Sequence, residues 1–162
     1  MLSLPTSYFD FLERYGNSQW IYGDELVFLW AGQDLESFNI EYGVHTLAPG
    51  LILIGSDGSG EAFGFDLRSP HKPMVQVPFV GLNWKYANVV ANEFSDWQAM
   101  LAPREDGDSH PQMQLAEVKP VLFGGDSTDP ANRAWLTRAQ HFEYVRFWND
   151  VFLAASAKLT PQ

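Results

Sequence analysis

Glycine, serine and aspartate gather in one segment, PGLILIGSDGSGEAFGFD at positions 49–66, and such residues could bind phosphate, activate a nucleophile or hold calcium. A phosphate-binding Walker loop needs a lysine, yet the first lysine of the chain is Lys72. A nucleophile elbow needs glycine two residues on either side of its serine, and neither Ser56 nor Ser59 meets that condition. A calcium loop needs acidic or asparagine ligands at alternate positions, which the segment lacks. The spacing therefore favours a turn between two strands.

The other residues that could act in catalysis are scattered along the chain. The histidines do not have the spacing of a metal site; they are His45, His71, His110 and His141. Asp126 and Asp129 could bind a cation, but an Asx turn and a helix N-cap also explain their positions. Asp24 and Glu25 could act as an acid/base pair only if buried, and adjacent strand residues point to opposite faces. We therefore predict no catalytic residue, no metal site and no cofactor, and expect that the protein is not an enzyme.

Aromatic and acidic side chains are interleaved between positions 15 and 36, a combination that resembles the hot spot of a protein interface. The predicted partner-binding residues are Trp20, Tyr22, Asp24, Glu25, Asp34 and Glu36. The same pattern also fits core strands with a solvated acidic face, because aromatic side chains are usually buried. The residues leave both interpretations open.

Negative charge is concentrated in the first part of the chain. The formal net charge is -10, and positions 1–66 hold ten acidic residues against one basic residue, Arg14. Such a field repels nucleic acid and anionic membranes and attracts a basic protein. A solubilising surface is the alternative interpretation. We predict a protein partner, with no nucleic-acid or membrane partner.

Apolar periodicity and turn signals predict the elements that must position these residues. Helices are expected at 5–15, 33–42, 93–101 and 137–157, and strands at 23–30, 51–54, 61–66, 74–80 and from 118. The turn between the second and third strands is expected to depend on Gly55, Asp57, Gly58 and Gly60, with Gly58 or Gly60 at positive φ. Thr137 and Gln140 have the spacing of a capping box at the start of the longest helix.

Length and composition suit one domain with an appendage. The predicted division is a core at 1–101, a linker at 102–117 and a C-terminal extension at 118–162. The linker is charged and rich in glycine and proline, and its clearest part is 102–111. We expect the final helix to pack on the core through Val145, Trp148, Phe152 and Ala155. The chain has no cysteine and no signal-like or membrane-spanning stretch, so a soluble, cytoplasmic protein is expected.

Three motifs in order resemble the SUKH superfamily. The first is Leu4-Pro5-Thr6-Ser7-Tyr8-Phe9-Asp10-Phe11-Leu12 with Tyr15-Gly16, similar to the opening of the family. The second runs from Pro49-Gly50-Leu51 through Ile54-Gly55-Ser56-Asp57-Gly58 to Asp66, and the third is Phe94, Trp97 and Leu101. Members usually carry a helix before the first motif, which here begins at Leu4, so that helix is expected to be absent or lost from a shortened start.

The resemblance implies an α+β fold: a single domain whose central, mostly antiparallel sheet is flanked by helices, here with a C-terminal helical extension. The superfamily includes bacterial immunity proteins of polymorphic toxin systems and eukaryotic cell-wall and signalling regulators. It therefore implies a non-catalytic domain that binds protein. We expect an immunity protein that neutralises a basic toxin domain, and the alternative is a regulatory or scaffolding module that binds a host protein.

Overall fold

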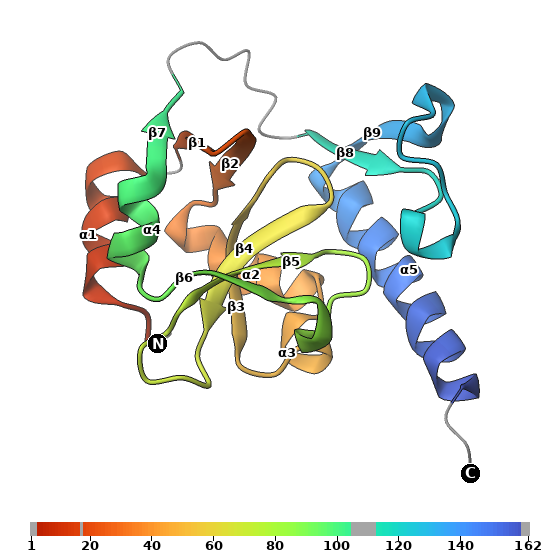
Figure 1. The fold of residues 1–162 in the computed structure, drawn as a ribbon, viewed down its shortest axis with the longest axis horizontal. Coiled ribbons are helices and arrows are strands. Elements are labelled where there is room, and N and C mark those ends of the chain that lie inside the picture. The colour runs from red at the N-terminus through yellow and green to blue at the C-terminus, as the bar shows by residue number, and fades with distance from the viewer. Residues whose placement is uncertain (1–2, 17, 105–112, 160–162) are drawn as a thin grey trace.

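An antiparallel sheet of seven strands forms the centre of the computed structural model, which describes residues 3–16, 18–104 and 113–159 (Figure 1). The strand order is β6-β5-β4-β3-β2-β1-β7. The strands are β1 (Gln19–Tyr22), β2 (Glu25–Leu29), β3 (Leu51–Ser56), β4 (Glu61–Asp66), β5 (Met74–Pro78), β6 (Asn88–Ala91) and β7 (Leu101–Pro103). A separate hairpin pairs β8 (Met113–Glu117) with β9 (Arg133–Thr137). The α+β fold expected from the sequence is confirmed.

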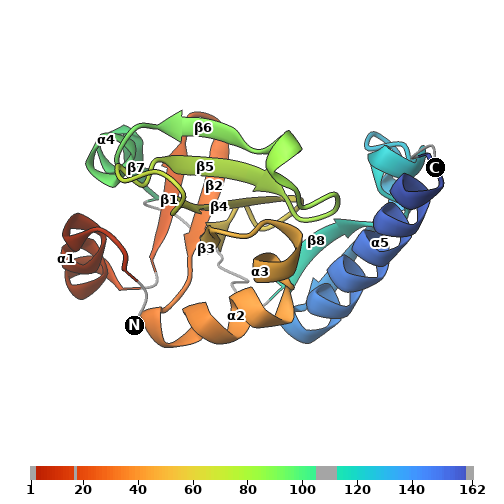
Figure 2. The ribbon, with the colours of Figure 1, turned by 90° about the horizontal axis from the view of Figure 1, so that it is seen from below.

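Helices flank this sheet at both ends and along one face (Figure 2). They are α1 (Thr6–Tyr15), α2 (Leu35–Glu41), α3 (Val44–Leu47), α4 (Phe94–Met100) and α5 (Arg138–Lys158). Figure 2 shows α1 and α4 at one end, α2 and α3 beneath the sheet, and α5 at the opposite end. Tyr8 of α1 packs its ring against Phe65 of β4 and Phe94 of α4, at centroid distances of 5.4 and 5.3 Å. The first and third motifs of the sequence therefore meet in one aromatic core.

The sheet is curled, so that strands far apart in its order approach each other. The ring of Tyr22 on β1 contacts Phe63 on β4, with the centroids 6.3 Å apart. At the adjacent position, Gln76 of β5 donates a hydrogen bond of 2.8 Å to the carboxylate of Glu25 on β2. Curling closes the core and brings polar side chains from β2 and β5 together at its rim.

The hairpin of β3 and β4 confirms the predicted turn, with one correction. Gly58 has φ +81°, and a Cβ atom there would lie 2.7 Å from the ring of Phe28, so both conformation and space favour glycine. The Asp57 carboxylate accepts hydrogen bonds from the backbone N–H groups of Ser59 and Glu61, at 2.8 and 3.1 Å. Gly60 has neither positive φ nor a close neighbour, so the turn places no such demand on it.

The remaining glycine of that set lies outside the turn. Gly55 belongs to β3, where a Cβ atom would lie 2.5 Å from the carbonyl oxygen of Phe28 on β2. It also adjoins the register shift between β3 and β4 at Leu53 and Gly55. Gly55 is therefore needed for the close approach of two strands, a requirement that the run of glycines does not reveal.

Several short elements were not predicted. β1 pairs with both β2 and β7, so it is interior to the sheet although it has only four residues. The prediction of a strand from Val118 was wrong. β8 already ends at Glu117, and after Pro120 the residues Val121–Phe123 form a 3-10 turn, η3. β7 and β8 occupy the two ends of the expected linker, and residues 105–112 lie outside the described part of the chain.

Helix α5 begins where the sequence placed it and contacts the core through a narrow stripe. Thr137 and Gln140 form the predicted capping box. The buried residues of the helix are His141, Val145 and Asn149, which are spaced four residues apart. Trp148 and Phe152 are only half-buried and Ala155 is exposed, so the expected apolar face is narrower and more polar than predicted. No helix in the described residues is both long and apolar enough to cross a membrane.

Candidate functional site

The two aromatic residues of the predicted binding surface belong largely to the core. Trp20 packs its ring on Phe11 at 5.2 Å and donates a hydrogen bond of 2.6 Å to the Ser18 hydroxyl. Tyr22 packs against Phe63 and the buried ring of Trp97. Both side chains are half-buried. Their contacts explain their positions structurally, and only their outer edges remain available to a partner.

The four acidic residues of that surface fall into two pairs. Asp24 lies in the turn between β1 and β2, and Glu25 begins β2. Asp34 and Glu36 lie beyond the other end of the strand, at the start of α2. Since each strand residue advances the chain by about 3.3 Å, β2 alone spans roughly 13 Å, and the second pair lies several residues past its end. The structure therefore does not gather the four carboxylates into one cluster.

A different acidic cluster forms where the sheet curls. Burial, and then the nearby charges of Asp57 and Glu25, raise the pKa of Glu61 from 4.5 to about 7. Asp57 and Glu61 flank the β3–β4 turn, so the sequence could have placed them together. Glu25 joins them only because of the curl, which no local pattern encodes. Glu61 is thus the acidic residue that the sequence analysis missed.

A cavity of about 600 Å³ opens beside this cluster, between the core and the C-terminal extension. Its core side includes Phe79, which follows β5, and Tyr86. Its other side includes Leu115 of β8 and Leu122 of η3. The charged side chains that line it, within the described residues, are Asp57, Glu61, Glu117 and Arg133. An apolar cavity with a few charged groups is the common form of a binding site.

His141 lies at the inner end of the cavity lining and is neutral. Burial, and then the charge of Arg138, lowers the pKa of His141 to about 3. Its Nδ1 is 2.6 Å from the hydroxyl oxygen of Tyr42, and Arg138 donates to that oxygen at 3.1 Å. The tautomer of His141 that carries its proton on Nε2 can accept the Tyr42 hydroxyl proton at Nδ1. These contacts join α5 to α2.

Asp126 and Asp129 stabilise local turns, as their spacing indicated. Asp126 accepts from the backbone N–H and the hydroxyl of Thr128, at 2.8 and 2.7 Å. Asp129 accepts from the N–H of Ala131 at 2.9 Å and caps a 3-10 turn, η4 (Pro130–Asn132). Within the described residues, no three histidine, aspartate or glutamate side chains are grouped as metal ligands.

The comparison with protein families decides the relationship that the motifs suggested. The model of the SMI1 / KNR4 family (SUKH-1) matches residues 1–100. The chain belongs to this family. Membership is consistent with an immunity-like or regulatory domain that binds protein. No curated protein sequence matches the chain.

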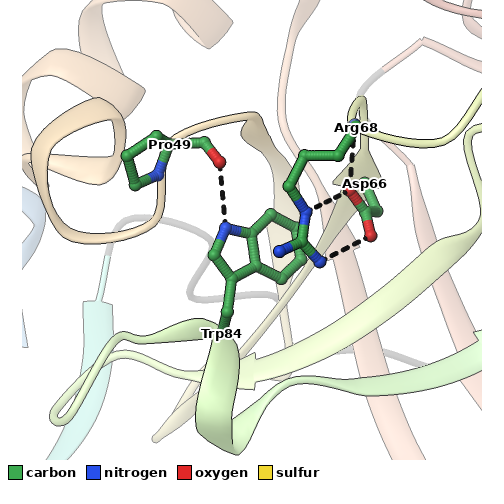
Figure 3. A network of polar contacts seen from close by, with 4 residues as sticks. All are labelled: Pro49, Asp66, Arg68 and Trp84. Atoms are coloured by element: carbon green, nitrogen blue, oxygen red, sulfur yellow. Dashed lines mark hydrogen bonds and ion pairs between the residues drawn. The ribbon is translucent and has the colours of Figure 1, made fainter.

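The central motif of this SUKH-1 domain is held together by a network where β3 begins and β4 ends (Figure 3). Arg68 donates from Nε and Nη2 to the two carboxylate oxygens of Asp66, both at 2.9 Å, which lowers the pKa of Asp66. The same guanidinium stacks 3.4 Å above the ring of Trp84, in the 3-10 turn η2 (Trp84–Tyr86). The Trp84 indole N–H donates to the carbonyl of Pro49 at 2.9 Å. Pro49 and Asp66, the two ends of the motif, are therefore joined through Arg68 and Trp84.

Proposed function

We propose that this SUKH-1 domain is an immunity protein that neutralises a basic toxin domain by binding it, without catalysing a reaction. The observation that carries the proposal is the charge of positions 1–66, where ten acidic residues face one basic residue. These positions lie within the family match. An immunity protein must bind its toxin before the toxin acts, so long-range attraction is an advantage. Complementary charge accelerates the encounter of two proteins.

The arrangement of the acidic residues supports a broad field rather than one ion-pair site. Asp24 and Glu25 lie at one end of β2, while Asp34 and Glu36 lie past the other. Asp24, Glu25 and Glu36 are exposed and Asp34 is half-buried. Exposed carboxylates contribute little to folding, so their charge is free to act on a partner.

The test measures association with the toxin domain encoded beside the gene, at several ionic strengths. We expect the on-rate to fall about tenfold or more between low and physiological salt. Two variants, Asp24→Asn with Glu25→Gln and Asp34→Asn with Glu36→Gln, should each slow association while leaving thermal stability nearly unchanged. The matched control, Glu143→Gln with Asp150→Asn, removes the same charge from the exposed face of α5.

The outcomes separate the two kinds of partner. Slower association in both N-terminal variants, but not in the control, supports the immunity proposal. Equal slowing in all three variants would mean that only net charge matters. A salt-independent on-rate, or a neighbouring gene that encodes a metabolic enzyme and no toxin, would contradict the proposal and favour a regulatory module.

A further inference from the structure

We infer that the cavity between the core and the C-terminal extension binds a basic side chain, arginine or lysine, flanked by apolar residues in an extended segment of the partner. The inference rests on the proposed function only in taking the occupant to be a partner protein.

The size and lining of the cavity set the kind of occupant. A volume of about 600 Å³ lies in the range of sites that enclose small ligands or a few side chains. Phe79 and Tyr86 from the core and Val121 and Leu122 of η3 all line it. Tyr86, Val121 and Leu122 keep part of their surface accessible. Apolar side chains of a bound segment would cover this surface and gain by its removal from water.

Among the described residues, three carboxylates line the cavity, and two of them are already engaged by the chain itself. Asp57 accepts from the N–H groups of Ser59 and Glu61 and from the Ser59 hydroxyl. Glu117 accepts from the N–H of Val121 at 2.9 Å. Arg133, the one cation that lines the cavity within the part of the chain that the structure describes, donates to the carbonyl of Ser127 at 2.8 Å. These groups shape the walls and leave a net negative charge in the cavity.

Glu61 is the carboxylate that remains available. Its side chain accepts no hydrogen bond and forms no ion pair within residues 3–16, 18–104 and 113–159. Asp57 and Glu25 lie close enough to oppose its ionisation, and Gln76 already donates to Glu25. A guanidinium or ammonium group at Glu61 would offset the repulsion among three carboxylates and supply charge-assisted hydrogen bonds. An anionic or neutral occupant would leave that repulsion in place.

The experiment uses the full chain and blocked peptides as probes. The reference peptide is acetyl-Leu-Arg-Leu-amide, and citrulline in place of arginine gives a neutral peptide of the same shape. Acetyl-Gly-Arg-Gly-amide keeps the charge and removes the apolar flanks. Binding is followed by NMR titration. We expect the reference peptide to shift the signals of Glu61, Tyr86 and Leu122, and to bind about tenfold or more tightly than either control peptide.

Variants of the protein locate the charge contact. Glu61→Gln should weaken the reference peptide about tenfold and leave the citrulline peptide unchanged. Glu13→Gln, which removes an exposed carboxylate from α1, should change the affinity for neither peptide.

Equal affinity for arginine and citrulline peptides, no effect of Glu61→Gln, or signal shifts confined to another face would each overturn the inference. Loss of peptide binding with intact salt-dependent toxin association would refute the cavity site alone, whereas peptide binding without toxin association would refute the proposed function alone.

Discussion

Glu61 lies in an environment that its place in the sequence does not reveal. Between pH 4.5 and about 7, the folded chain holds a proton on Glu61 that the unfolded chain releases. Ionisation therefore favours the unfolded state, and the contribution of Glu61 to stability falls as pH rises through this window. Glu61→Gln should raise the free energy of unfolding by about 1 kcal/mol above pH 7 and leave it nearly unchanged at pH 4.

Urea denaturation of the wild type and Glu61→Gln across this pH range measures the effect. His141 acts in the opposite sense, because the unfolded chain gains a proton below pH 6.5 that the folded chain accepts only near pH 3. Comparing the variant with the wild type at each pH removes that contribution, since His141 is present in both. A variant that is less stable than the wild type at pH 8 would show that Glu61 is stabilising in its ionised form.

At the scale of residues, the sequence predicted the roles that depend only on neighbours along the chain. Gly58 and Asp57 follow from turn chemistry, because a positive φ and an Asx hydrogen bond are decided within four residues. Gly55 is also a glycine, but it is required because the carbonyl of Phe28 on another strand lies too close to admit a Cβ atom. The link from Glu25 to Glu61 requires the curl of the whole sheet. Neither the requirement for glycine at position 55 nor the proximity of Glu25 to Glu61 could be predicted from neighbouring residues in the sequence.

At the scale of elements, α5 is attached to the core by polar side chains as much as by apolar ones. The Asn149 side chain accepts from the N–H groups of Gly81 and Leu82, at 2.7 and 3.3 Å, and donates to the carbonyl of Phe79 at 2.8 Å. Asn149→Leu should lower the free energy of unfolding by about 3 kcal/mol, because it leaves these buried backbone groups without partners.

Urea denaturation checks the value, and amide hydrogen exchange at Gly81 and Leu82 checks its cause. Asp150→Leu is the matched control, since it places the same side chain at the neighbouring exposed position. If Asn149→Leu unfolds at the same urea concentration as the wild type, the hydrogen bonds to the loop contribute nothing measurable.

The long helix itself was predictable and its attachment was not. The capping box of Thr137 and Gln140 involves only the first turn of α5, and the sequence contains all of it. The buried stripe includes His141 and Asn149, which apolar periodicity counts as surface residues. Their partners, Tyr42 and the backbone at Phe79, Gly81 and Leu82, lie many residues earlier in the chain. Sequence periodicity identifies apolar helix faces, whereas the buried face of α5 includes polar side chains that form hydrogen bonds to distant parts of the chain.

At the scale of the whole molecule, the extension covers part of the core. Val145 is fully buried in the main hydrophobic cluster, and Phe142 packs its ring on Tyr42 at 4.6 Å. Ending the chain after Arg104 should therefore lower the free energy of unfolding by about 3 kcal/mol or more and expose apolar surface. Urea denaturation and the binding of a hydrophobic dye, compared with the full chain, measure the two effects. A shortened chain as stable as the whole, with no added dye binding, would show that the extension folds independently.

The two sides of the cavity differ in how freely their residues can be substituted. Phe79, Tyr86 and the β3–β4 turn belong to the family-matched region, and Phe79 is also part of the main hydrophobic core. Val121, Leu122 and Leu115 lie beyond residue 100, in a small hairpin and a 3-10 turn that the seven-stranded sheet does not include. Substitutions of the exposed side chains there, Val121 and Leu122, can therefore reshape the cavity without disturbing the main core. Selection for a new partner would then accumulate mutations in the extension faster than in the sheet, and related chains with different partners would diverge first along η3 and β8.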